Sequence, residues 1–210
     1  MAVVGGTDKM SAYCALGWLR TYAKLDPNQP FTYDAWADAV RAGRTISTNG
    51  PLLDLEVEGR QIGDKIELPP GNDATLAVSA TAESWWPINR LEIVCNGRVV
   101  AGTESAAGAK VLRIQERVPV AGSGWIAARC AASAPGASGY VAAAHTSPVY
   151  MTRGDSRAFD GPAAQHMLRL IEGGIEYLSV LATDFDAASR ERMIRIYREA
   201  EAELKRRFQR

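Results

Sequence analysis

The sequence predicts a mainly β protein with flanking helices, and three observations support this fold class. Between Leu53 and Met151, short runs of alternating apolar and polar residues recur at regular spacing, with Gly, Pro and Asn between them. This pattern is typical of strands joined by tight turns. About seven or eight such strands favour a two-sheet, immunoglobulin-like β-sandwich. Before Gly43 and after Arg153, apolar residues instead repeat at helical spacing.

The pattern changes within the stretch from Ala42 to Asp64. Gly43 ends a helical pattern, as a glycine that adopts positive φ does at a helix C-terminus. From Leu53 onward the alternation has a period of two, which places one strand face on a core. The sequence therefore predicts three parts: residues 1–50, a β-sandwich at 51–153 and a helical hairpin at 154–210.

The first part is predicted to contain a strand end and two helices. Ala2 to Val4 resembles the tail of a short buried strand that opens into a loop. The segments Ser11–Leu25 and Phe31–Ala42 both carry apolar stripes at helical spacing. Thr32 is the predicted N-cap of the second helix, whose aromatic side chains are expected to pack in the core.

Sharper local predictions are possible at the hairpin and at the C-terminal helices. Asn96-Gly97 lies between the alternating runs Arg90–Cys95 and Arg98–Ala101. Both turn residues tolerate positive φ, so this pattern predicts a type I′ hairpin. Asp160 and Asp186 are the predicted N-caps of the two C-terminal helices.

The overall composition argues against several classes of partner. The 210-residue chain has 24 basic and 24 acidic residues, so no net charge attracts it to nucleic acid or to an anionic membrane. No run of about 18 apolar residues is long enough to cross a bilayer, and the start MAVVGG has no signal-peptide pattern. We therefore expect no nucleic-acid partner and no membrane partner.

The cysteines Cys14, Cys95 and Cys130 form a sparse, odd-numbered set. They are expected to be reduced, partly buried thiols. A bridge between Cys95 and Cys130 across sandwich strands is the alternative.

Few residues have the chemistry of a site. Asp8 follows the predicted strand end, which in an α/β barrel is the active-site face, so it is a candidate metal ligand or acid–base group. The alternative is that Asp8 caps the turn or helix that follows. His145, near the end of a predicted strand, is a candidate rim residue for binding, a hydrogen-bonded strand histidine or a catalytic base. Known nucleophile and phosphate-binding motifs are missing from the sequence, so no catalytic residue is assigned.

Trp85 and Trp86 are candidate binding residues. Neighbouring side chains of an extended segment point to opposite faces, so one Trp is expected in the core and the other at the surface. The exposed ring would stack on a sugar, anchor a partner domain or lie beneath a loop.

Five segments carry the pattern of a known family: GGTDKMS (5–11), LRTYAKL (19–25), FTYDAWADAVRAGRTISTNGPLL (31–53), RLEIVCNGRVVA (90–101) and AHTSPVYM (144–151). They resemble the C-terminal part of the CehA/McbA-type metallohydrolases. These enzymes are relatives of the PHP phosphoesterases among the metal-dependent hydrolase barrels. The resemblance covers nearly the whole chain, and residues 31–53 are its most specific part.

The resemblance implies a full-length enzyme whose barrel binds zinc or manganese and hydrolyses ester, amide or carbamate type bonds. It also implies that residues 1–50 are the end of that barrel and that Asp8 closes its metal site. The other ligands, a His-x-His pair and further His and acidic residues, would precede Met1. Met10 departs from the pattern, since relatives often have a histidine there. A lone carboxylate cannot hold a catalytic zinc, so this chain is expected to have no cofactor and no activity by itself.

Two functional hypotheses follow. The first is an accessory C-terminal region of such a hydrolase, with the upstream metal-binding barrel of the same protein as its partner. The second is a free-standing β-sandwich module that binds a glycan or a protein through Trp85 or Trp86. The apolar residues Val3, Val4, Trp18 and Trp36 would be exposed without the barrel, so a homo-oligomer is a further expectation.

Overall fold

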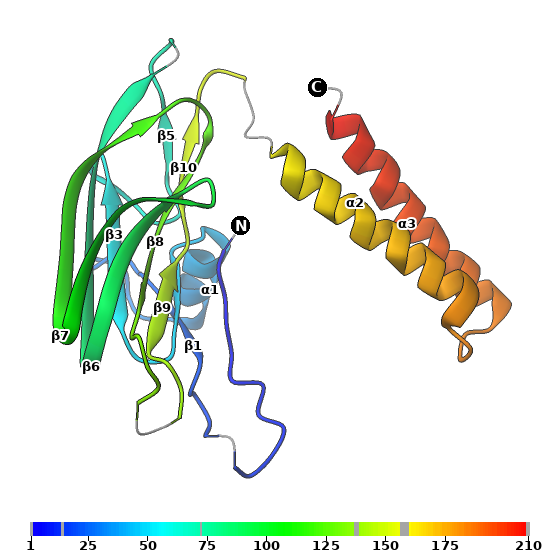
Figure 1. The fold of residues 1–210 in the computed structure, drawn as a ribbon, viewed down its shortest axis with the longest axis horizontal. Helices are drawn as coiled ribbons and strands as arrows, with labels where there is room; N and C mark the ends of the chain where they lie inside the picture. Colours follow the sequence, from blue (N-terminus) through cyan, green and yellow to red (C-terminus); the bar gives the residue numbers. More distant parts are fainter. Residues whose placement is uncertain (1, 14, 72, 137–138, 156–159, 209–210) are drawn as a thin grey trace. The chain divides into compact units, whose positions relative to one another are not determined.

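A computed structural model of the chain describes residues 2–13, 15–71, 73–136, 139–155 and 160–208. The chain divides into two compact units, Met1–Ala158 and Phe159–Arg210. The first unit holds the strands and one helix, and the second is helical (Figure 1). Strand residues outnumber helical ones, which confirms the mainly β class.

Within the described residues, the strands of the first unit form one continuous ten-stranded sheet. Helix α1 (Tyr33–Arg41) lies between the first two strands in the chain. The strands are β1 (Arg20–Ala23), β2 (Thr45–Thr48), β3 (Leu52–Val57), β4 (Arg60–Gln61), β5 (Lys65–Glu67), β6 (Ala74–Cys95), β7 (Arg98–Val120), β8 (Gly124–Ala131), β9 (Ala143–Thr146) and β10 (Val149–Thr152).

Strand β6 organises the sheet. One of its edges pairs antiparallel with β7, which runs beside it in Figure 1. Its other edge pairs first with β3 and then with β8. Strand β8 pairs with β9 and with β10. Strand β9 in turn pairs with β2, and β2 pairs with β1. The last strand, β5, pairs parallel to β10. The sheet as a whole curls around a core.

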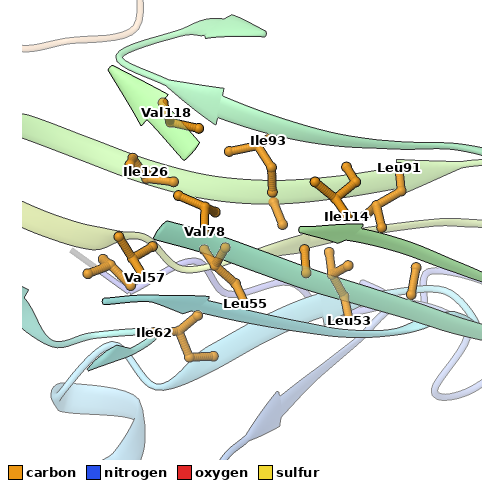
Figure 2. Packing of buried hydrophobic residues seen from close by; sticks show 14 of the residues in the cluster. Leu53, Leu55, Val57, Ile62, Val78, Leu91, Ile93, Ile114, Val118 and Ile126 are labelled. Carbon is orange, nitrogen blue, oxygen red and sulfur yellow. The ribbon is translucent and has the colours of Figure 1, made fainter. Parts of the chain in front are cut away.

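The core follows from the alternation of apolar residues. In β3, Leu53, Leu55 and Val57 are buried while the residues between them are exposed. Figure 2 shows these side chains meeting Ile114 of β7 and Ile126 of β8. A strand whose residues alternate in this way buries its apolar face and exposes its polar face to water.

The predicted hairpin is confirmed between β6 and β7. Cys95 pairs with Arg98, and Asn96 and Gly97 have φ values of 48° and 83°. Both values are positive, as a type I′ turn requires. The Asn96 side chain accepts a hydrogen bond from the Trp125 backbone N–H at 2.9 Å, which ties the turn to β8.

The helix predicted over Ser11–Leu25 is wrong. Gly17 adopts a φ of 74°, and the residues after it form β1 instead. Thr21 lies opposite Ser47 in an antiparallel pair with β2. Pairing with a distant strand has therefore overridden the helical spacing, as tertiary context often does. Ala2 to Val4 likewise forms no strand.

Helix α1 confirms the second helix prediction, with Thr32 as its N-cap accepting from the Ala35 N–H at 3.2 Å. The expectation that its aromatic residues pack in the core is wrong. Its buried residues are the small Ala35 and Ala39. Tyr33 and Trp36 are exposed on the outside, with ring centroids 6.1 Å apart.

The second unit is a helical hairpin of α2 (Gly161–Glu176) and α3 (Ala187–Phe208), with a π-helical turn at Tyr177–Leu181. The predicted N-caps are confirmed: Asp160 accepts from Ala163 N–H and Asp186 from Ser189 N–H. The helices approach closely because Gly174 has no side chain to collide with the Tyr197 ring. No helix in the described part of the chain is long and apolar enough to cross a membrane.

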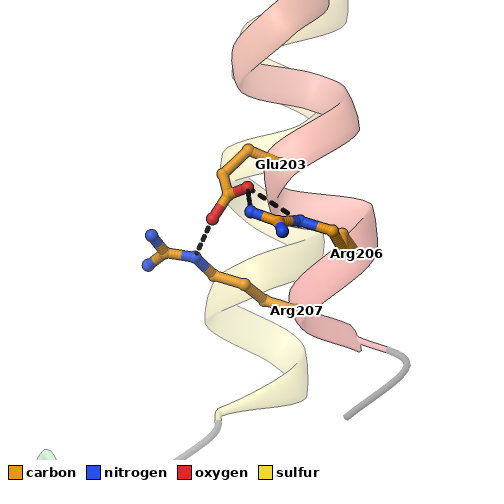
Figure 3. A network of polar contacts seen from close by, with 3 residues as sticks. All are labelled: Glu203, Arg206 and Arg207. Atoms are coloured by element: carbon orange, nitrogen blue, oxygen red, sulfur yellow. Dashed lines mark hydrogen bonds and ion pairs between the residues drawn. The ribbon is translucent and has the colours of Figure 1, made fainter.

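The basic end of α3 pairs within its own helix. Figure 3 shows Glu203 accepting hydrogen bonds from Arg206 and Arg207. The hydrogen bond from Arg206 contributes most, and with the bond from Arg207 it holds the pKa of Glu203 below its ordinary value. Exposed pairs of this kind contribute little to stability.

The immunoglobulin-like arrangement and the barrel remnant remain predictions. Among the described residues, all strands join one curled sheet. Strand β2, from the predicted first part, pairs with β9 of the predicted sandwich.

Two leucines of β3 provide a matched test of the core. Leu55 is 1% exposed and Leu52 is 52% exposed. Leu55→Ala should lower the free energy of unfolding by about 2–5 kcal/mol, because it removes buried contacts and leaves a cavity. Leu52→Ala should cost less than about 1 kcal/mol. Chemical denaturation measures both, and equal losses would contradict this description of the core.

The hairpin turn provides a second test. Gly97→Ala should destabilise the protein by roughly 1–2 kcal/mol, because a side chain at this φ meets the following carbonyl. Gly122→Ala is the control, since a Cβ meets nothing within 4 Å at either glycine but only Gly97 has a positive φ. Thermal unfolding followed by circular dichroism compares the two, and a neutral Gly97→Ala would argue against the type I′ geometry.

Candidate functional site

Asp8 lies in an N-terminal segment without regular secondary structure. It is exposed, and its φ of 45° places its backbone in the left-handed region. Its proposed role as a metal ligand stays a prediction.

The segment before Asp8 is fixed to the sheet by hydrogen bonds. The Val3 N–H donates to Ser147 Oγ at 2.8 Å, and Thr45 Oγ1 donates to the Val3 carbonyl at 2.7 Å. Two residues further on, the Gly5 N–H donates to Thr21 Oγ1 at 2.8 Å. Thr45 and Ser147 are fully buried and contact each other, so the segment is held by β1, by β2 and by the residue after β9.

The residues present do not form a metal site by themselves. Among the described residues, no group of three or more His, Cys, Asp or Glu side chains could hold a metal ion. A zinc site needs about three protein ligands. Asp8 alone therefore does not fit a catalytic metal.

His145 lies in a row of polar residues across the sheet. It pairs with Ser47 of β2 on one side and Arg129 of β8 on the other. Arg129 Nε in turn donates to Glu92 of β6 at 2.6 Å. His145 Nδ1 lies 2.7 Å from the Thr146 carbonyl, which matches the alternative of a hydrogen-bonded strand histidine.

Ser47, Arg129 and His145 of this row line a shallow depression together with Arg90 and Val3. Activation of a serine requires a hydrogen bond from its hydroxyl to the base. In the part of the chain that the structure describes, no such bond joins Ser47 to His145. Because its polar side chains line the depression, the row is a candidate binding surface, and the role of His145 in binding stays a prediction.

Trp85 and Trp86 are both exposed, at 78% and 46%. The expectation that one of them packs in the core is wrong. The register of β6 against β7 shifts between Glu83 and Ile88, and Ile88 takes the buried position instead. Such an irregularity bends a strand and redirects its side chains. Lys110 Nζ lies 5.1 Å from the centroid of the Trp85 ring, so the two side chains form a cation–π contact.

Trp86 lines a pocket of about 160 Å³ with Trp18, Tyr140 and Pro87. The Trp18 and Tyr140 rings are 4.9 Å apart between centroids and tilted by 43°. We refer to this as the aromatic pocket. Its position follows from the topology: Arg20 pairs with Thr48 and Thr48 with Ala144, so the start of β1, the end of β2 and the start of β9 meet at one end of the sheet.

Sequence reasoning missed Trp18, Asn49 and Tyr140 as members of this pocket. Asn49 fixes the pocket wall, because its amide N donates to the Val141 carbonyl at 2.7 Å and its Oδ1 accepts from the Ala143 N–H at 2.7 Å. Gly50 leaves room for the Trp86 ring, since a Cβ at this position would lie only 3.3 Å from it. The residues come from separate segments, so no local pattern could have grouped them.

Cys95 and Cys130 are free thiols, as expected, and the alternative bridge is not formed. Cys130 pairs with Leu91, so Cys95 lies four residues further along β6. That offset is roughly 13 Å, beyond the reach of a disulfide. Cys14 lies outside the described residues.

Comparison with known proteins gave no match: no family model, no curated protein and no solved structure matches the chain.

Burial makes Cys130 a test of the sheet. It raises the pKa of the Cys130 thiol from its ordinary value of 9.0 to about 11. The folded state favours the neutral thiol. The raised pKa therefore favours the folded state fully at a pH below 9, and this contribution to the free energy of unfolding is lost as the pH rises through 11. At pH 8, Cys130 should react with iodoacetamide roughly 100-fold more slowly in the folded than in the unfolded chain. Mass spectrometry of the labelled peptide measures this, and equal rates would contradict the burial.

Proposed function

We propose that the chain is the accessory C-terminal region of a metal-dependent hydrolase that acts on ester, amide or carbamate type bonds. It packs on the metal-binding barrel of that enzyme and is inactive alone. One observation carries the docking proposal, a gathering of exposed large apolar side chains between residues 4 and 36. This N-terminal apolar group consists of Val4, Met10, Tyr13, Leu16, Tyr22, Phe31, Tyr33 and Trp36.

The exposure in this group is large enough to need an explanation. Tyr13 and Phe31 are 101% and 86% exposed. Single exposed apolar residues are normal, whereas several within one segment are typical of an interaction surface. Aromatic residues and Met are also enriched in protein interfaces. Helix α1 buries its alanines and turns its aromatic residues outward, which is the arrangement expected if a second surface covers them.

Asp8 lies within the same N-terminal segment. In the proposal it supplies one metal ligand, and the barrel supplies the others. Residues 1–50 would then continue the barrel, with Arg44 to Pro51 near the mouth of its site. The curled sheet would be a variant of the immunoglobulin-like sandwich that braces the barrel. The sequence segments that resemble metallohydrolases, above all residues 31–53, support this assignment.

A mixing experiment tests the proposal. The polypeptide encoded directly before the chain is produced separately and titrated with the 210-residue chain in a calorimeter. We expect binding, and hydrolysis of a nitrophenyl ester once zinc or manganese is added. Phe31→Asp should weaken binding by about 30-fold, as loss of an interface aromatic anchor does. Asp8→Ala should abolish hydrolysis while leaving binding unchanged.

The matched control is Val180→Asp in the second unit, where the side chain is also exposed, at 73%. It should leave binding unchanged. An upstream polypeptide that does not bind would overturn the docking proposal. Full activity of Asp8→Ala would remove Asp8 from the site. Self-association of the chain alone, lost in Phe31→Asp, would assign the same surface to a homo-oligomer instead.

The second candidate function is a free-standing module that binds a glycan or a protein. The exposure of both Trp85 and Trp86 favours it. In that case an array of glycans should capture the wild-type chain but not a variant with both residues changed to Ala.

A further inference from the structure

We propose that the aromatic pocket binds a compact N-methylated ammonium group, such as the trimethylammonium head of choline. This inference rests on the pocket alone and does not depend on the proposed hydrolase. It therefore stands or falls independently of any metal or barrel.

Three rings, from Trp18, Trp86 and Tyr140, line this one small pocket. The Trp18 and Tyr140 rings are tilted by 43° to each other, so they do not form a parallel stack. Aromatic cages of this composition hold quaternary ammonium ions, because the ring faces are negative and attract a cation. Trp is the strongest of the aromatic residues in this respect.

The rest of the lining is uncharged, since Asn49, Pro87 and small Ala and Gly residues complete it. Among the described lining residues, no basic side chain would repel a cation. Elsewhere in the first unit the aromatic rings already carry cations, with Lys110 over Trp85 and Arg20 over Tyr22.

The hydrogen bonding of the pocket selects the type of ligand. Two polar side chains stand in the described lining: Asn49 already bonds to the backbone of Val141 and Ala143 through both ends of its amide, and Tyr140 carries a hydroxyl. A sugar or a primary ammonium brings several donors, each of which needs an acceptor in the pocket. A trimethylammonium group has no N–H donor, so it needs none.

The size of the pocket limits the ligand to one such group. Its volume of about 160 Å³ is close to that of a buried cavity of about 150 Å³ that holds a benzene molecule. A trimethylammonium head is of this size. A neutral group of the same shape would also fit, so the charge of the ligand is the property to test.

The experiment titrates the 210-residue chain with choline and with 3,3-dimethylbutan-1-ol, its neutral isostere. Tryptophan fluorescence reports binding, and sodium chloride keeps the ionic strength constant. Choline should bind at least about fivefold more tightly than the isostere, because the isostere lacks the cation–π attraction. Equal affinity, or no binding of choline, would overturn the proposal.

Variants locate the site. Trp86→Ala should weaken choline binding by about tenfold or more, whereas Trp86→Phe should keep part of the affinity. Trp85→Ala is the matched control, because Trp85 is the adjacent exposed Trp and does not line the pocket. Should Trp86→Ala fail to fold, Trp18→Leu removes another ring and should give a similar loss. An equal loss in Trp85→Ala would overturn the assignment to this pocket.

Discussion

Hydrogen bonding along both edges of β6 is the constraint on which the first unit depends. One edge carries β7, and the other is shared between β3 and β8. A strand of 22 residues is roughly 70 Å long when straight, too long for one small core. The register shifts of β6 against β7 near Ile88 let the pair bend so that both halves face the same interior. The bend also puts Trp85 and Trp86 outside, and Trp86 there lines the aromatic pocket.

Local signals were enough to predict several elements and not others. The Asn96-Gly97 turn, the Thr32 cap and the helical hairpin depend on neighbours in sequence, and the structure confirms them. The segment Ser11–Leu25 has helical spacing, but its partner is β2, which no local pattern reveals. The prediction that Trp85 and Trp86 point to opposite faces is wrong because a register shift leaves no mark in the sequence. The aromatic pocket escaped prediction for a related reason, since four distant segments build it.

Strand β2 connects the N-terminal segment, which carries part of the N-terminal apolar group, with the aromatic pocket. At its start, Thr45 holds the N-terminal segment through the Val3 carbonyl. Just beyond its end, Asn49 holds the wall of the aromatic pocket through Val141 and Ala143. Both attachments depend on β2 pairing with β9. The residues from Thr45 to Asn49 therefore position the parts of the first unit that are proposed to interact with other molecules.

The hydrogen bond from Val3 to Ser147 joins residues 144 positions apart, and this separation affects how the protein is made. The ribosome adds residues at about 5–20 per second, so the N-terminal segment waits roughly 7–30 s for its partner to be synthesised. Strand β5 waits similarly for β10. During that interval unpaired strands and apolar side chains are accessible to chaperones and to neighbouring nascent chains. The sheet cannot close until translation has passed residue 152.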